Sequence, residues 1–250
     1  MQPYFTLIRK ELAGYFFSLS GYIIIAVAMF LLGLSFVVLL INLQQEPTSM
    51  PVTEVFYISY FFWYILLLSS PVITMRLFAM EKFTGTFETL MTTPVSDLQV
   101  VLAKFSAGLA FYLLMWVPLL GCLLVVQHYA KDVGPFDVGA VGSTFLGIFL
   151  LGCMFISLGC CASALTRSQV TAAMISLLFG VSLFLVSFLA ARVPVHTTWQ
   201  TQVLGTLAFF DQMRDFSRGV VDTRAVVLYL SLTLFFLFLT LRVVESRRWK

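Results

Sequence analysis

The sequence predicts an all-α polytopic membrane protein, and two observations lead to that prediction: its composition and the length of its apolar runs. Of the 250 residues, 60% are hydrophobic and 11% are charged, with a mean hydropathy of +0.98. Soluble domains are roughly 45–50% apolar and 25% charged. A helix needs about 20 mostly apolar residues to cross a bilayer, and the chain has six such runs. We therefore expect residues 1–250 to form a single transmembrane domain.

The apolar runs place the expected elements in order along the chain. The first segment, about residues 2–18, mixes aromatic and aliphatic residues with Arg9, Lys10 and Glu11, which is typical of a helix lying at the membrane surface. The run after it is longer than a secretory signal and lacks a small-residue cleavage site, so we expect it to remain as the first span. The six spans are expected at about residues 22–43, 55–74, 98–127, 138–165, 170–190 and 225–241.

Small residues recur at every fourth position in the fourth and fifth spans. They are Gly139, Ser143 and Gly147 in one span, and Ala172, Ser176 and Gly180 in the other. Small residues four apart let helix backbones approach closely in lipid. They indicate either ordinary contacts within the bundle or, as a sharper alternative, a dimer seam or a translocation path.

The longest polar connection, about residues 192–224, precedes the last span and contains a second amphipathic segment. Phe209, Met213 and Phe216 fall on one helical face, and Gly219 ends the pattern. This spacing predicts an outer helix that lies on a surface before the sixth span.

The distribution of Lys and Arg predicts which side of the membrane each end occupies, since cytoplasmic loops carry an excess of these residues. With both termini inside, the inner segments hold ten of the fifteen basic residues. Their net charge is then +5 and that of the outer loops is −2, which together give the net charge of +3 of the chain. The inner basic residues are Arg9, Lys10, Arg76, Lys82, Lys104, Arg167, Arg242, Arg247, Arg248 and Lys250.

The inner segment from Met75 to Lys104 holds the densest group of polar residues between two spans. On a helix over about residues 78–93, one polar side collects Glu81, Gly85, Glu88 and Thr92. Glycine costs a helix about 1 kcal/mol relative to alanine, so Gly85 indicates either close approach by another backbone or a break between two short helices. The pattern fits a helix that transmits force between spans and equally a helix that lies on lipid.

The end of this segment and the start of the next span are also marked. Pro94 stops the helix, and Ser96 with Gln99 three residues later matches a capping box that would begin a new helix at about Asp97.

Several kinds of chemistry have no matching residues in the sequence. The central parts of the spans lack ionisable residues, which disfavours an ion-coupled carrier, and no Gly-Lys pair forms a phosphate-binding P-loop. No cysteine or carboxylate is spaced from His128 or His196 so as to form a metal site or a nucleophile pair with it. The four cysteines lie in apolar runs, where a thiol behaves as a small apolar group. No basic and aromatic face for nucleic acid is found. We expect no catalytic site, bound cofactor or metal on this chain.

The stretch from Arg76 to Ser96, RLFAMEKFTGTFETLMTTPVS, resembles the cytoplasmic motif of type-2 ATP-binding-cassette permeases, R-x-x-x-x-E-(K/R)-x-x-G-T-x-E-x-L-x-x-x-P-(V/I)-S. The order of spans is similar to that of the gliding-motility-associated permease subunit and of the copper-enzyme maturation permease of nitrous oxide reductase. In the outer loop, a shorter F-x-R-G-(V/I)-(V/I)-D motif of the gliding-motility branch is matched by Phe216, Arg218, Gly219 and Asp222.

The resemblance implies a coupling helix between spans two and three that docks into a separate ATPase subunit, which holds ATP and Mg. It implies that Glu81, Thr86 and Glu88 lie on the docking face, that Gly85 lies where the two chains come closest, and that Pro94 ends the helix. Met80 departs from the family, which often has an acid there. A second permease chain, the same or related, and the inner membrane of a bacterium are also implied.

Two functions follow from these expectations. The first is a permease that exports a hydrophobic or amphipathic molecule. The alternative is a mechanotransmitting or assembly subunit that uses the same ATPase to act on an outer protein through the loop before span six, without moving a small molecule.

Overall fold

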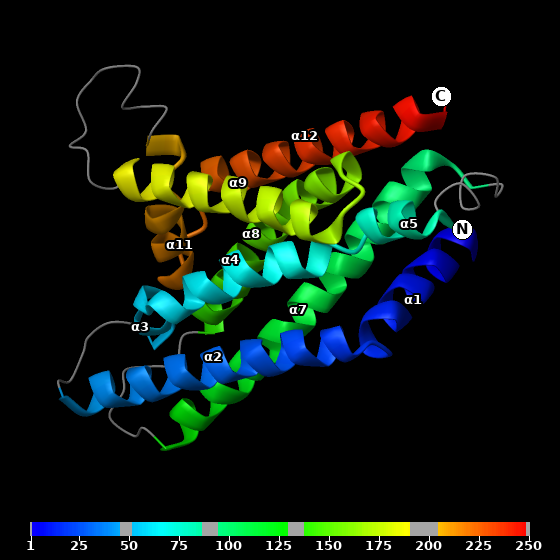
Figure 1. Ribbon diagram of the computed structural model, residues 1–250. Helices are drawn as coiled ribbons and strands as arrows, with labels where there is room; N and C mark the ends of the chain where they lie inside the picture. Colours follow the sequence, from blue (N-terminus) through cyan, green and yellow to red (C-terminus); the bar gives the residue numbers. More distant parts are fainter. Residues whose placement is uncertain (1, 46–51, 87–94, 130–137, 191–204, 249–250) are drawn as a thin grey trace.

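The computed structural model describes residues 2–45, 52–86, 95–129, 138–190 and 205–248, and this described part contains helices and no strands (Figure 1). Six of its helical segments are long and apolar enough to cross a membrane. The prediction of an all-α polytopic membrane protein is therefore confirmed. The candidate spans are Leu19–Ile41, Tyr60–Thr84, Asp97–His128, Val138–Leu165, Gln169–Ala190 and Thr223–Ser246.

The first two helices meet at a sharp elbow. Helix α1 (Gln2–Phe16) ends just before α2 (Leu19–Gln45) begins. Ser18 accepts a hydrogen bond from the Gly21 backbone at 3.3 Å, and a Cβ at Gly21 would lie 2.0 Å from the Tyr15 carbonyl oxygen. Glycine is needed at this position because the backbones of the two helices come so close.

The second span starts later than the expected residue 55, because the helix is interrupted at Ser59. Helix α3 (Val52–Ile58) stops before Ser59, whose backbone is extended, and α4 (Tyr60–Thr74) continues after it. The Ser59 hydroxyl bonds to the Phe56 carbonyl at 2.7 Å and to the Ser35 hydroxyl of α2, also at 2.7 Å. These bonds satisfy polar groups at the break.

The remaining helices surround α8 (Val138–Leu165). It is the most buried candidate span, since 78% of its most apolar stretch is buried inside the protein. Its neighbours include α4, α7 (Asp97–Tyr129), α9 (Gln169–Ala190) and α12 (Thr223–Arg248). Two glycines of α8 allow this packing: a Cβ at Gly152 would lie 2.3 Å from the Tyr112 ring, and one at Gly159 would lie 2.1 Å from the Thr74 hydroxyl oxygen.

The short helices lie at opposite ends of the bundle. Figure 1 shows α5 (Ala79–Thr84), α1 and both termini at one end, here called the α5 end. Helices α3 and α11 (Phe209–Ser217) lie at the other end, here called the α11 end. The candidate coupling segment and the outer amphipathic segment are therefore on opposite sides of the spans.

Candidate functional site

The beginning of α5 is fixed to the end of α8. The Ser163 hydroxyl oxygen accepts hydrogen bonds from the backbone N–H groups of Phe78 and Ala79, each at 3.1 Å. The Lys82 ammonium donates to the Ala164 carbonyl oxygen, which lies at the C-terminal end of α8. Phe78 and Ala79 are completely buried. Backbone and side-chain contacts thus hold this segment to the most buried helix of the bundle.

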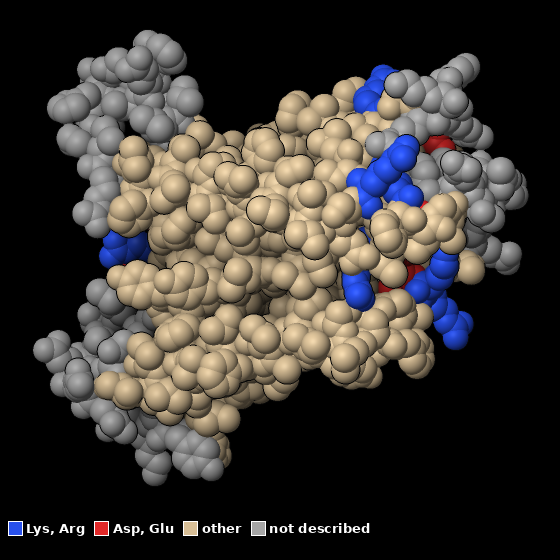
Figure 2. All heavy atoms as spheres, in the orientation of Figure 1, with Lys and Arg blue, Asp and Glu red and all other residues tan. Residues whose placement is uncertain are grey.

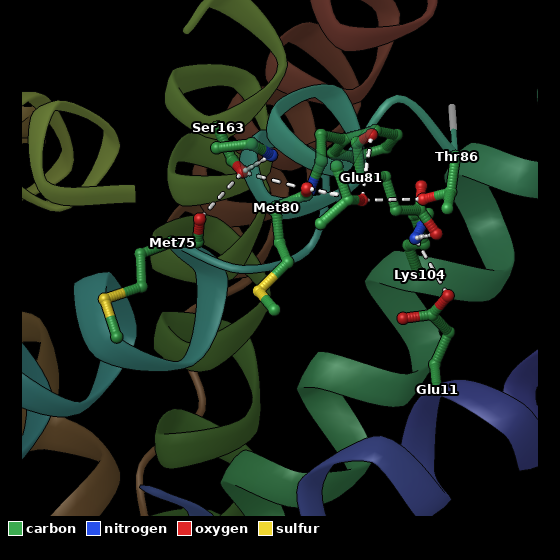
Figure 3. A network of polar contacts seen from close by, with 10 residues as sticks. Glu11, Met75, Met80, Glu81, Thr86, Lys104 and Ser163 are labelled. Atoms are coloured by element: carbon green, nitrogen blue, oxygen red, sulfur yellow. Dashed lines mark hydrogen bonds and ion pairs between the residues drawn. The ribbon is translucent and has the colours of Figure 1, made fainter. Parts of the chain in front are cut away.

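A buried lysine joins α5 to two further helices (Figure 3). The Lys104 Nζ atom in α7 lies 2.8 Å from a carboxylate oxygen of Glu81 and 2.8 Å from one of Glu11 in α1. The Lys104 side chain is 3% exposed, and each of the two glutamate side chains is 16% exposed. One cation therefore links α1, α5 and α7 in an environment largely shielded from solvent.

The predicted single helix over about residues 78–93 is wrong in its described part, because α5 ends at Gly85. Gly85 has a φ of +74°, in the left-handed region that favours glycine. A Cβ there would meet nothing within 4 Å, so within the chain the backbone conformation, not a close contact, calls for glycine. Of the two alternatives raised by the sequence, the described residues have the break, at Gly85, and residues 87–93 lie outside them.

The far end of α5 projects away from the bundle as an exposed tip, defined here as residues 83–86. All four residues are exposed, and the Phe83 side chain is 77% exposed. The Thr84 hydroxyl bonds to the Met80 carbonyl at 3.0 Å and to the Thr86 hydroxyl at 2.9 Å. The tip therefore has internal hydrogen bonds and four exposed residues.

The structure separates the residues that the sequence and the family resemblance assigned to the polar side and docking face of this segment. Gly85 and Thr86 lie on the exposed tip, whereas Glu81 turns inward to Lys104. Glu88 and Pro94 lie outside the described residues. No local pattern predicts the Glu81 contact, because Lys104 is 23 residues away in α7 and also binds Glu11 in α1.

The start of α7 agrees with the predicted capping box. The Ser96 backbone N–H donates to the Gln99 side-chain oxygen at 3.3 Å, and the Gln99 backbone N–H donates to the Ser96 hydroxyl at 3.3 Å. Two backbone donors that would lack partners at a helix start are satisfied reciprocally. The predicted start at Asp97 is confirmed.

At the α11 end, a buried carboxylate binds two arginines. Glu54 in α3 is 1% exposed, and it contacts Arg214 at 3.0 Å and Arg218 through two hydrogen bonds of 2.9 and 2.7 Å. Burial alone would raise the pKa of Glu54, but the hydrogen bonds and charges of Arg218 and Arg214 outweigh it and hold that pKa below its ordinary value. The carboxylate fastens α11 to α3.

The apolar face of α11 packs into the protein. Phe209, Met213 and Phe216 are buried, as their spacing predicted, but the helix is embedded against α8, α3 and α9 and does not simply lie on a surface. The Ser143 hydroxyl donates to the Phe216 carbonyl at 2.5 Å, and a Cβ at Gly147 would lie 2.9 Å from the Met213 sulfur. These two small residues of α8 thus serve contacts within the chain.

The outer-loop motif residues each have a structural position. Phe216 lies in the core and Arg218 binds Glu54. Gly219 has a φ of +89°, which ends the helix as predicted. An Asp222 carboxylate oxygen accepts a hydrogen bond from the Arg224 backbone at 2.9 Å, at the start of α12. Together they shape the connection from α11 to the last span.

Comparison with known proteins identifies the family. A family model described as ABC-2 family transporter protein matches residues 44–241. No curated protein matches the chain. The matched range covers most of the chain, including the candidate coupling segment, four of the six candidate spans in full and most of the sixth. The chain therefore belongs to the ABC-2 family of transporter proteins, as a multi-pass permease subunit of an ATP-binding-cassette transporter.

Proposed function

We propose that this permease exports a hydrophobic or amphipathic molecule and is driven by a separate ATPase subunit that docks on the exposed tip, residues 83–86. The observation that carries the proposal is the attachment of this tip. It extends from a six-residue helix that is bonded to α8 through Ser163 and, through Glu81 and Lys104, to α7 and α1.

Such an attachment suits the transmission of movement. A short helix with one exposed end and several buried contacts moves together with the helices that hold it, as in rigid-body switching. A partner that pushes the tip would therefore displace the α5 ends of α1, α7 and α8 together. ATP and Mg would be held by the partner subunit, and hydrolysis would take place there.

The position of Glu81 divides the proposed roles within this segment. Because its carboxylate faces Lys104, we assign Glu81 to the link with the spans, in place of the docking contact implied by the resemblance. The docking surface would consist of Phe83, Gly85 and Thr86, with Glu88 on the continuation of the same segment and Pro94 at its end.

The charge distribution supports a cytoplasmic α5 end. Figure 2 shows Lys and Arg side chains gathered at the end that carries α1 and α5, with a smaller group at the α11 end. Cytoplasmic surfaces are enriched in these residues. We propose both termini in the cytoplasm, an inner-membrane location in a bacterium, and pairing with a second permease chain, as the resemblance to this family implies.

Two substitutions of exposed phenylalanines test the proposal. Phe83 in the tip is 77% exposed and Phe17 in the α1–α2 elbow is 91% exposed. In membranes from cells that express the transporter genes, Phe83→Asp should abolish co-purification of the ATPase, and Phe17→Asp should leave it intact. Equal recovery of the ATPase with both variants would refute docking on the tip.

A second pair of measurements separates docking from transmission. Glu81→Gln should retain the ATPase in the purified complex, because Glu81 faces inward, but should lower the substrate-stimulated ATP turnover several-fold. Unchanged stimulation would contradict the role given to Glu81.

The alternative function, a subunit that acts on an outer protein through the loop before span six, uses the segment that contains α11. The apolar face of α11 is occupied by contacts with α8, α3 and α9. The exporter is therefore the function that we propose.

A further inference from the structure

An apolar cavity opens between α2, α4 and α7. It has a volume of about 170 Å³. Its floor includes Ile65 and Met115, each 2% exposed, and its rim includes Ile23, Val27 and Leu68, which are 48–54% exposed. In Figure 2 the surface is hollowed between neighbouring helices in the middle of the molecule.

The lining and position of the cavity suit a hydrocarbon chain. Its lining surface is wholly apolar, and the Ser69 hydroxyl beside it bonds back to the Leu66 carbonyl. Apolar cavities of about 150 Å³ stay dry and accept small hydrocarbons. Because the rim belongs to two candidate spans, the medium outside it is the acyl region of the bilayer.

A cation lies about one helical turn beyond the α5 end of this cavity. Arg76 follows the lining residue Val72 by four positions, just past the end of α4. Ser20 precedes the lining residue Ile24 by four positions, which is about 6 Å along α2. The Arg76 guanidinium donates from Nη1 to the hydroxyls of Ser18, between α1 and α2, and of Ser20, in the first turn of α2. Arginine and two hydroxyls therefore meet at the end of the apolar cavity.

The hydrogen-bonding capacity of Arg76 is only partly used within the described chain. Its Nε atom is buried and has no hydrogen-bond partner there. No carboxylate of the described residues lies within 4.0 Å of the guanidinium, whereas Lys104 has two such partners and Arg214 and Arg218 share Glu54. A guanidinium with free donors matches the oxygens of a phosphate group.

We propose that the cavity and Arg76 together form a binding site for an anionic membrane phospholipid. One acyl chain occupies the cavity between α2 and α4, and the phosphate lies on Arg76 with the hydroxyls of Ser18 and Ser20. The site is distinct from the exposed tip and does not depend on which molecule the transporter exports. Because Arg76 lies in the turn between α4 and α5, the bound lipid also stabilises the segment that carries the tip.

Lipid binding to the purified full chain in detergent tests the proposal, measured by native mass spectrometry with two lipids of identical acyl chains. Phosphatidylglycerol should bind at least tenfold more tightly than phosphatidylcholine. Arg76→Gln should remove this preference, while Arg9→Gln, an exposed arginine of α1, should preserve it. Ala28→Phe, which fills the cavity floor, should weaken the binding of both lipids.

Controls keep each outcome decisive. Thermal unfolding verifies that each variant is folded, and Arg76→Lys, which keeps the charge, should retain part of the preference if Arg76→Gln does not fold. Equal binding of the two lipids, or an unchanged preference in Arg76→Gln, would overturn the proposal. Inorganic phosphate should not displace phosphatidylglycerol at millimolar concentration; displacement would show an anion site without a lipid chain and would also overturn it.

Discussion

Removal of the Lys104 ammonium is expected to destabilise the α5 end strongly. The two carboxylate oxygens that it binds each lie 2.8 Å from Nζ, so they are no more than about 5.6 Å apart. At an effective dielectric constant of about 20, two unit charges at that distance repel by roughly 3 kcal/mol. Lys104→Met leaves Glu11 and Glu81 facing each other without the cation, and loss of one partner of a buried pair typically costs about 3–5 kcal/mol.

Thermal unfolding in detergent measures this cost. At about 2–4 °C per kcal/mol for a chain of this size, the repulsion of roughly 3 kcal/mol should lower the Tm of Lys104→Met by roughly 6–12 °C. The triple variant Lys104→Met, Glu11→Gln, Glu81→Gln should recover most of the loss, because the repulsion is gone. Lys10→Met, at an exposed lysine of α1, is the control and should have little effect. A Tm of Lys104→Met within about 1 °C of the wild type would refute the electrostatic argument.

Three further predictions concern the packing of α8, the Glu54 pair and the end of α5. Gly159→Ala should lower the free energy of unfolding by about 1–3 kcal/mol, because the new Cβ would lie 2.1 Å from the Thr74 hydroxyl oxygen. Gly142→Ala is the control, since a Cβ there would meet nothing within 4 Å, and equal Tm values for the two variants would contradict the close packing of Gly159. The pKa of Glu54 is held below its ordinary value, so its contribution to stability is complete above the unfolded pKa of about 4.3 and is lost as the pH falls through the lower folded value. The Tm of the wild type should therefore fall more steeply below pH 4 than that of Glu54→Gln, and parallel curves would count against an ionised Glu54. Because Gly85 has a positive φ, Gly85→Val should lower the free energy of unfolding by about 1–2 kcal/mol, and Gly85→Asn should lower it less. Tm and ATP turnover measure both effects, and identical results for the two variants would argue against the left-handed turn.

The sequence predicted the features that depend on neighbouring residues. Apolar runs gave the spans, and the fourth starts and ends at the predicted residues 138 and 165. The capping box at Ser96 and Gln99 and the glycine at position 219 are also local signals, and the structure contains both. Each of these features follows from the spacing of residues within one helix or turn.

Features that depend on partners distant in the sequence could not be predicted in the same way. Helical periodicity put Glu81 on the polar side of its segment, but the charge that it binds is Lys104 in another helix. Glu54 similarly finds Arg218 at a separation of 164 residues. The break at Ser59 is supported by a hydroxyl from α2. These positions are decided by how the helices pack, because a buried charge or hydroxyl needs a partner wherever the fold provides one.

Photocrosslinking in intact membranes shows whether the ATPase subunit docks on residues 83–86. A photoreactive phenylalanine analogue would replace Phe83 in one strain and Phe17 in the other, both with exposed side chains. We expect Phe83 to crosslink to a protein that carries a phosphate-binding P-loop, and Phe17 to yield no such adduct. Crosslinking of that ATPase from Phe17 and not from Phe83 would show that it does not dock on residues 83–86.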